Sequence, residues 1–133
     1  MRVMLDTNIC IYVIKQRPER VIERFRALAV GDVGISVITL AELQYGAGKS
    51  SRPRQNHEAL QQFVSPLRVA DFDRRASAAY GELRPKLEKK GLPIGAMDLL
   101  IAAHALSPGV TLVTSNVREF KQVPGLSLEN WAD

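Results

Sequence analysis

The chain has 133 residues, 46% of them hydrophobic, and its 18 lysines and arginines against 14 acidic residues give a formal charge of +4. This length suits one domain around a single apolar core, and the one cysteine excludes an internal disulfide framework and a multi-cysteine zinc site. No apolar run is long enough to cross a membrane and no signal-peptide pattern opens the chain, so we expect a cytoplasmic protein that does not contact a membrane.

Apolar runs and helical patterns alternate through the first half of the chain. Pro18 suits the first turn of a helix, and Ser36 is a favoured residue at a helix N-terminus. Cys10, between two isoleucines, is expected to be a small buried residue. The predicted elements are a strand over 3–5, a helix over 9–16, a helix from Pro18 with Val21, Phe25 and Leu28 turned inward, a strand over 33–35 and a helix from Ser36 that carries Glu42.

The second half continues this alternation. Pro85 falls inside a long helical pattern and is expected to kink or interrupt it. The predicted elements are a loop over 49–55, a helix with an inward stripe over 59–64, a strand over 67–70, a helix from Asp73 to Gly91, a helix over 97–106 and strands over 110–113 and 126–128. Strands that alternate with helices, without hairpin signals, predict a single α/β domain with a mainly parallel sheet flanked by helices.

Three acidic residues fall at related places in these elements. Asp6 directly follows the first strand, Glu42 lies about two turns into the helix after the second strand, and Asp98 lies near the start of an apolar helix. Each also has an ordinary interpretation, as a turn residue, a surface glutamate and a helix-capping aspartate. Ligands of a parallel sheet gather at the carboxyl ends of its strands, where clustered carboxylates need a hard cation such as Mg²⁺ or Mn²⁺ to relieve their repulsion.

Neither histidine indicates a different kind of site. His57 lies in a polar stretch, and His104 lies late in the apolar helix, about 240° around the helix axis from Asp98. We expect both to be structural or surface residues. A carboxylate-bound cation supplies an activated water, so the predicted chemistry needs no serine or cysteine nucleophile and no histidine base.

Four segments, taken together and in order, resemble the PIN-domain nucleases. They are residues 6–8, 35–43, 93–105 and 112–120, and the likeness covers essentially the whole chain, 1–133, as one PIN domain. Among these nucleases the chain is most similar to the VapC toxins of toxin–antitoxin systems.

The resemblance implies a PIN-like fold and an Mg²⁺- or Mn²⁺-dependent endoribonuclease that hydrolyses RNA to leave a 5′-phosphate. By position, Asp6, Glu42 and Asp98 are the metal-binding catalytic acids. Many relatives carry a further aspartate where this chain has Asn116, and Glu119 is the nearest acid, so Glu119 is predicted as the fourth carboxylate. The supporting polar residues are predicted to be Thr7, Asn8, Thr114 and Asn116.

A narrower likeness concerns the substrate and the partners. Residues 5–12, 123–126 and 129–131 resemble VapC toxins that cut the initiator tRNA(fMet) in its anticodon loop. The family also implies a VapB antitoxin whose tail occupies the acidic groove, a toxin homodimer, a hetero-oligomer with the antitoxin, and contact with operator DNA only through the antitoxin. Among the basic residues, Lys15, Arg17 and Lys49 are expected to hold the RNA backbone.

Two other functions fit parts of the sequence. Phosphatases of the haloacid dehalogenase type also place an aspartate after the first strand, but they need a second one two residues later, where this chain has Asn8. A catalytically inactive PIN-like module that binds RNA or protein is the non-enzymatic alternative, and missing acids would favour it.

Overall fold

The computed structural model describes residues 1–132 and contains a five-stranded sheet in the order β3-β2-β1-β4-β5. All four strand pairs are parallel. The strands are β1 (Val3–Leu5), β2 (Val33–Ser36), β3 (Arg68–Ala70), β4 (Thr111–Val113) and β5 (Leu128–Glu129). The predicted α/β fold with a parallel sheet flanked by helices is therefore confirmed, while residue 133 of the predicted domain 1–133 lies outside the described residues.

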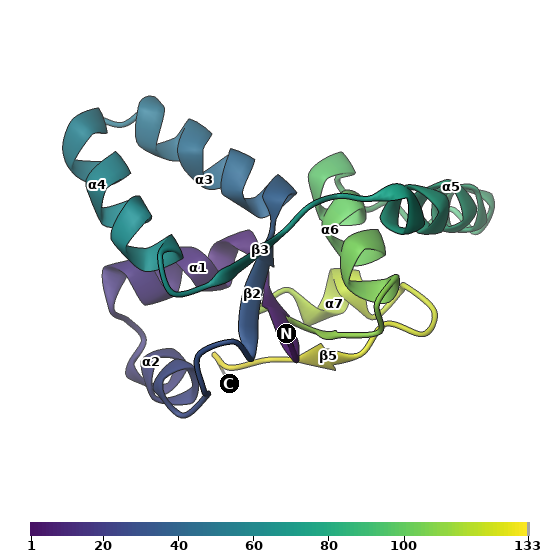
Figure 1. Cartoon of the computed structure of the whole chain (residues 1–133). Helices are drawn as coiled ribbons and strands as arrows, with labels where there is room; N and C mark the ends of the chain where they lie inside the picture. The colour runs from purple at the N-terminus through teal and green to yellow at the C-terminus, as the bar shows by residue number, and fades with distance from the viewer. Residues whose placement is uncertain (133) are drawn as a thin grey trace.

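Helices cover both faces of this sheet. They are α1 (Thr7–Lys15), α2 (Glu19–Arg26), α3 (Val37–Gly48), α4 (Pro53–Val64), α5 (Arg74–Lys89), α6 (Ala96–Leu106) and α7 (Val117–Phe120). In Figure 1 the sheet stands between α1, α2 and α4 on one side and α5, α6 and α7 on the other. No helix within residues 1–132 has the length and apolarity needed to cross a membrane.

The helices enclose two apolar cores, one on each face of the sheet. Along β1, Val3 and Leu5 belong to the core under α1, α2 and α4, whereas Met4 belongs to the core under α5 and α6. This alternation explains why the central strands are wholly apolar, since a strand covered on both faces has no polar side. Cys10 is buried in the first core, as predicted.

The order of the strands creates a topological switch point at the carboxyl edge of the sheet. From β1 the chain builds outward through β2 and β3, and it later returns to the other side of β1 as β4 and β5. Leu5 pairs with Val113, so the residues that follow them, Asp6 and Thr114, leave the sheet side by side. Open parallel sheets bind ligands at such a switch point, and the fold thus locates the candidate site between β1 and β4.

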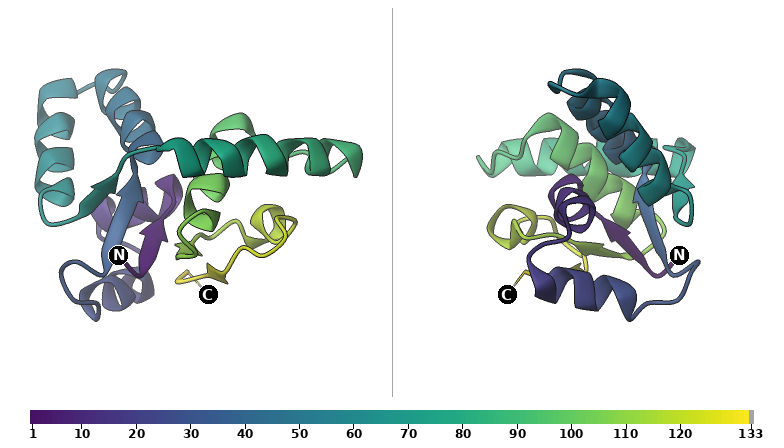
Figure 2. Two further views of the ribbon diagram at one scale, coloured as in Figure 1. Left: turned by 45° about the vertical axis from the view of Figure 1, so that its right-hand side comes forward. Right: turned by 90° about the vertical axis from the view of Figure 1, so that its left-hand side faces the viewer.

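Several predicted boundaries were wrong. Helix α4 begins at Pro53, inside the expected loop over 49–55, because proline is accepted in the first helical turn. Helix α5 continues unbroken through Pro85 (Figure 2), which lies on the exposed side, where water can satisfy the carbonyl that loses its partner. Strand β5 lies at residues 128–129 and not at 126–128, and the short helix α7 was not predicted.

Candidate active site

Asp6 is a buried carboxylate at the switch point. It ends β1 and caps α1, where its Oδ1 accepts a hydrogen bond from the Ile9 amide at 2.9 Å. The Thr114 side chain also hydrogen-bonds to Asp6 from the end of β4. Only 3% of Asp6 is exposed, and burial raises its pKa despite these donors. These contacts therefore orient the carboxylate of Asp6 at the switch point.

Glu42, on α3, lies in the same region as Asp6. The Thr7 hydroxyl donates to Glu42 Oε1 at 2.6 Å, which joins the start of α1 to the middle of α3. Glu42 is half-buried and lines the same groove as the buried Leu43 and Ala47 of α3. Thr7, predicted as polar support, thus orients this carboxylate.

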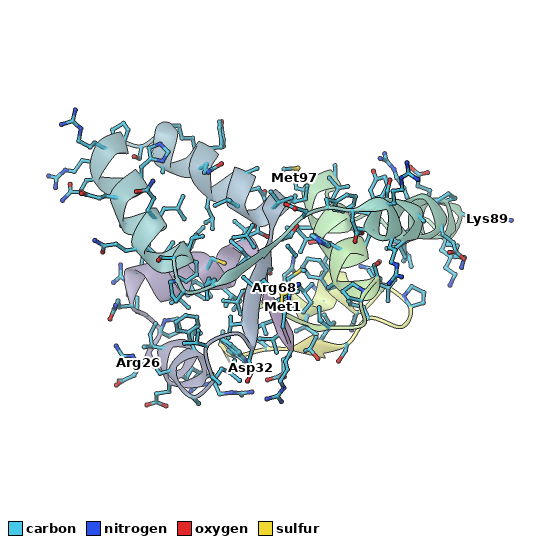
Figure 3. All side chains as sticks on the ribbon, viewed as in Figure 1. Met1, Arg26, Asp32, Arg68, Lys89 and Met97 are labelled. Carbon is cyan, nitrogen blue, oxygen red and sulfur yellow. The ribbon has the colours of Figure 1, made fainter. Side chains whose placement is uncertain are left out.

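Asp98 lies in the first turn of α6 and interacts electrostatically with the other acids. Its pKa is raised to about 6, first by burial and then by repulsion from Glu119, Glu42 and Asp6. Met97, the preceding residue, marks this end of α6 in Figure 3. The repulsion shows that four carboxylates from four separate chain segments share one region.

Glu119, on α7, is held at both carboxylate oxygens. The Gly95 amide donates to Oε1 at 3.0 Å, and the Asn116 side-chain amide donates to Oε2. The Asn116 backbone amide in turn donates to Thr114 Oγ1 at 2.9 Å, so the residues that orient Glu119 and Asp6 form one connected network. The network supports the prediction that Glu119 is the fourth carboxylate and that Asn116 and Thr114 are its polar support.

Gly95 is a site residue that the sequence patterns did not reveal. It acts through its backbone N–H, which any residue type supplies, so its side chain carries no signal. A Cβ built on Gly95 would lie 3.9 Å from Asp98 Oδ2, in ordinary van der Waals contact with the acid cluster. The position is therefore close to both Glu119 and Asp98.

The donor set fits a hard divalent cation. Within residues 1–132, no lysine or arginine forms an ion pair with Asp6, Glu42, Asp98 or Glu119. In the same range, no three acidic, histidine or cysteine side chains already meet closely enough to enclose an ion. After burial, repulsion from Glu119, Glu42 and Asp6 adds to the raised pKa of Asp98, so negative charge gathers here. An all-oxygen set of this kind suits Mg²⁺ or Mn²⁺.

The three predicted RNA-binding residues have different surroundings. Lys15 lines a groove of about 330 Å³ between α1, α3 and α4, together with Thr7 and Glu42. Lys49 Nζ lies 4.8 Å from the ring centroid of the exposed Tyr45. Arg17 is exposed beyond the end of α1. Only Lys15 therefore shares a groove with one of the acids.

Asn8 differs from the other predicted polar residues. Its side chain is exposed in the first turn of α1, and its backbone amide, not its side chain, hydrogen-bonds to Asp6. Neither histidine appears among the groups that shift the pKa of Asp6 or Asp98. His104 is buried against Ser36, and His57 lies beside Gly48.

The C-terminal residues that carried the narrower likeness have a packing role. Trp131 is buried, and its indole Nε1 donates to Glu129 Oε1 at 3.1 Å. Arg24 also donates to Glu129 and lies over the Trp131 ring, with its guanidinium carbon 5.8 Å from the centroid. These contacts attach Glu129 and Trp131 to α2. They therefore describe packing and do not by themselves indicate the substrate.

Known proteins are similar to this chain over nearly its full length. The PIN domain family profile matches residues 3–126. Ribonuclease VapC2 of Rickettsia felis is 50% identical over 129 residues, which cover 96% of each chain, and tRNA(fMet)-specific endonuclease VapC of Salmonella typhimurium is 46% identical over 131 residues, which cover 98% of each. The crystal structure of VapBC2 from Rickettsia felis bound to a promoter DNA fragment superposes with a TM-score of 0.92 at 48% identity, over 98% of this chain and 99% of that one. DNA-bound VapBC from Salmonella typhimurium gives a TM-score of 0.93 at 45% identity, over 98% of each chain.

Proposed function

The chain belongs to the PIN domain family, and on this basis we propose that it is a metal-dependent endoribonuclease, the toxin of a VapBC-type toxin–antitoxin pair. One observation carries the proposal: four carboxylates from separate segments repel one another at the carboxyl edge of the sheet, with no ion-paired lysine or arginine in residues 1–132 to offset them. Such an arrangement costs stability and is expected at a site that binds a cation.

Asp6, Glu42, Asp98 and Glu119 are proposed to hold the cation, which is Mg²⁺ or Mn²⁺ by the chemistry of these ligands. When bound, such a cation acidifies a water and neutralises charge on the scissile phosphate. The residues around the acids keep three of them in place: Thr114 holds Asp6, Thr7 holds Glu42, and Gly95 and Asn116 hold Glu119. Fixing ligands through such secondary contacts is worth about 10- to 100-fold in metal affinity or activity.

The substrate is proposed to be a tRNA, with the initiator tRNA(fMet) as the first candidate. Support comes from the relative at 46% identity that is named for this cleavage. The formal charge of +4 suits an RNA ligand, and Lys15, in the groove beside Glu42, is placed to meet a phosphate. Arg17 and Lys49 remain proposed RNA contacts outside this groove.

The partner is proposed to be a VapB-type antitoxin, since similar structures are VapBC complexes, two of them bound to DNA. In this proposal the antitoxin supplies the contact with operator DNA, and the toxin forms a homodimer within a larger assembly. The alternative of an inactive PIN-like binding module is less favoured, because the first three acids, Asp6, Glu42 and Asp98, are all present. The PIN fold excludes the haloacid dehalogenase alternative.

The test is cleavage of synthetic tRNA(fMet) by the purified protein with Mg²⁺, with Mn²⁺ and with EDTA. We expect metal-dependent cuts in the anticodon loop that are lost in Asp6→Asn. Asp32→Asn is the matched control, because it makes the same chemical change at an acid outside the proposed site, whose carboxylate pairs with Arg2 at 3.7 Å. Cleavage by Asp6→Asn at the wild-type rate would reveal a contaminating nuclease, and no cleavage of any RNA by the wild type would favour the inactive module.

A further inference from the structure

Two of the proposed acids depend on how α3 packs against α6, because α3 carries Glu42 and α6 carries Asp98. A buried hydrogen bond joins these helices away from the acids. Ser36 Oγ, at the start of α3, lies 2.7 Å from His104 Nδ1, near the end of α6. Ser36 is completely buried and His104 is 4% exposed. No part of the proposed function uses this pair.

The neighbouring contacts determine which atoms carry the protons. Ser36 Oγ accepts a hydrogen bond from the Ile38 amide at 3.0 Å as the N-cap of α3. The backbone of Asp71 also interacts with the His104 ring, and a backbone carbonyl can only accept a hydrogen bond. Since Nδ1 is directed at Ser36, this contact favours a proton on Nε2, and in that tautomer the Ser36 hydroxyl donates to Nδ1. The opposite tautomer would turn a lone pair towards the Asp71 carbonyl and leave the Ser36 proton without this acceptor.

The positions of Ser36, Glu42, Asp98 and His104 allow this hydrogen bond to set the distance between α3 and α6. Ser36 precedes Glu42 by six residues and His104 follows Asp98 by six residues, so the two helices pass each other in opposite directions. At 1.5 Å per residue, the hydrogen bond lies about 9 Å along each helix from the acid. A shift between the helices at the bond is carried to the two carboxylates, and misplacement by about 1 Å can cost about 100-fold in rate.

The ring of His104 is also fixed from its other side. Phe72 packs edge-on against it with ring centroids 5.2 Å apart, so that the imidazole contacts α3, its own helix and the connection between β3 and α5. A buried polar network whose groups are all satisfied defines one geometry more sharply than apolar packing does. A satisfied polar network is therefore suited to a part of the core where the distance between two helices must be fixed.

We propose that Ser36 and His104 are positioning residues that set the spacing of Glu42 and Asp98 for a shared divalent cation. This inference rests on the proposed function, because it assumes that the two acids bind one ion. It predicts that loss of the hydrogen bond lowers metal affinity without removing any carboxylate.

The test measures Mn²⁺ affinity by titration calorimetry, with urea unfolding in EDTA as a separate readout. We expect His104→Leu and Ser36→Gly each to weaken Mn²⁺ binding by about tenfold. His104→Asn, whose side-chain oxygen can replace Nδ1 as acceptor, is expected to restore most of that affinity. Ser36→Gly is included because glycine keeps most of the stability of a helix N-cap, so this variant folds even if His104→Leu does not.

The matched control is Ser127→Gly, which makes the same chemical change as Ser36→Gly but removes a 3.1 Å hydroxyl contact with Thr111 at the edge of the sheet. It should leave Mn²⁺ affinity unchanged. If folded Ser36→Gly binds Mn²⁺ like the wild type, the positioning role is refuted, whatever the wild type does to RNA. If the wild type binds Mn²⁺ but cuts no RNA, the ribonuclease proposal fails while the spacing of the site can still be tested.

Discussion

Asp98→Asn should make the metal-free protein more stable while it removes the activity. The pKa of Asp98 is raised from 3.8 to about 6, first by burial and then by the neighbouring acids. A rise of about two units corresponds to about 3 kcal/mol that the folded state loses when this carboxylate ionises. Screening by solvent around a half-buried side chain and the favourable dipole of the α6 N-terminus reduce this value. We expect a net gain of about 1–2 kcal/mol from the isosteric amide.

The gain should depend on pH in a defined direction. Because the folded pKa lies above the unfolded value of 3.8, the wild type is penalised fully above about pH 6, and the penalty disappears as the pH falls towards 3.8. The difference between the two proteins should therefore be largest at neutral pH and small near pH 4. Urea unfolding in EDTA, followed by the fluorescence of the buried Trp131, measures it.

Saturating Mn²⁺ should reverse the order of stability. A ligand at a concentration 100 times its dissociation constant stabilises a folded protein by about 2.7 kcal/mol. Only the wild type should show this gain with Mn²⁺. If Asp98→Asn is less stable than the wild type in EDTA at neutral pH, the carboxylate is stabilised in the fold, and the argument from repulsion is wrong. A difference that does not change with pH would also contradict it.

Three further predictions concern other residues. Thr39 has a buried hydroxyl without a hydrogen-bond partner in residues 1–132, so Thr39→Val should raise stability by about 1 kcal/mol in urea unfolding; a loss would mean that the hydroxyl is bonded in solution. Asn116→Ala frees one oxygen of Glu119 and should weaken Mn²⁺ binding by about tenfold in titration calorimetry, whereas unchanged affinity would remove Glu119 from the site or Asn116 from its support. Lys15→Gln should lower the salt dependence of tRNA binding by about one unit of slope in filter binding, and an unchanged slope would exclude a phosphate contact.

How clearly the sequence indicates a helix or strand depends on how deeply that element is buried. Strand β1 lies under helices on both faces, so it was predicted with its observed bounds. Strand β5 is a two-residue, half-buried edge strand, and its predicted position was shifted. Helix α7 has four residues, too few to show a helical period. Pro85 misled the prediction because its effect depends on which side of α5 faces water, which a local pattern does not specify.

The same distinction holds for the candidate site. Asp6 could be located because it follows a strand, and Glu42 and Asp98 because they lie on recognisable helices and match the motifs of a known family. The contact of Thr114 with Asp6 depends on β4 lying beside β1, a pairing of residues more than a hundred positions apart. Gly95 acts through its backbone, and His104 acts through a partner on another helix. Contacts of these kinds arise from tertiary structure and leave no local trace in the sequence.

The central claim is that the four acids together form one binding site for a divalent cation. Anomalous diffraction from a crystal of the wild-type protein soaked in Mn²⁺ tests it most directly. The account predicts a manganese peak bounded by the carboxylates of Asp6, Glu42, Asp98 and Glu119. Manganese bound only elsewhere on the protein, with none near these four carboxylates at a saturating concentration, would contradict it.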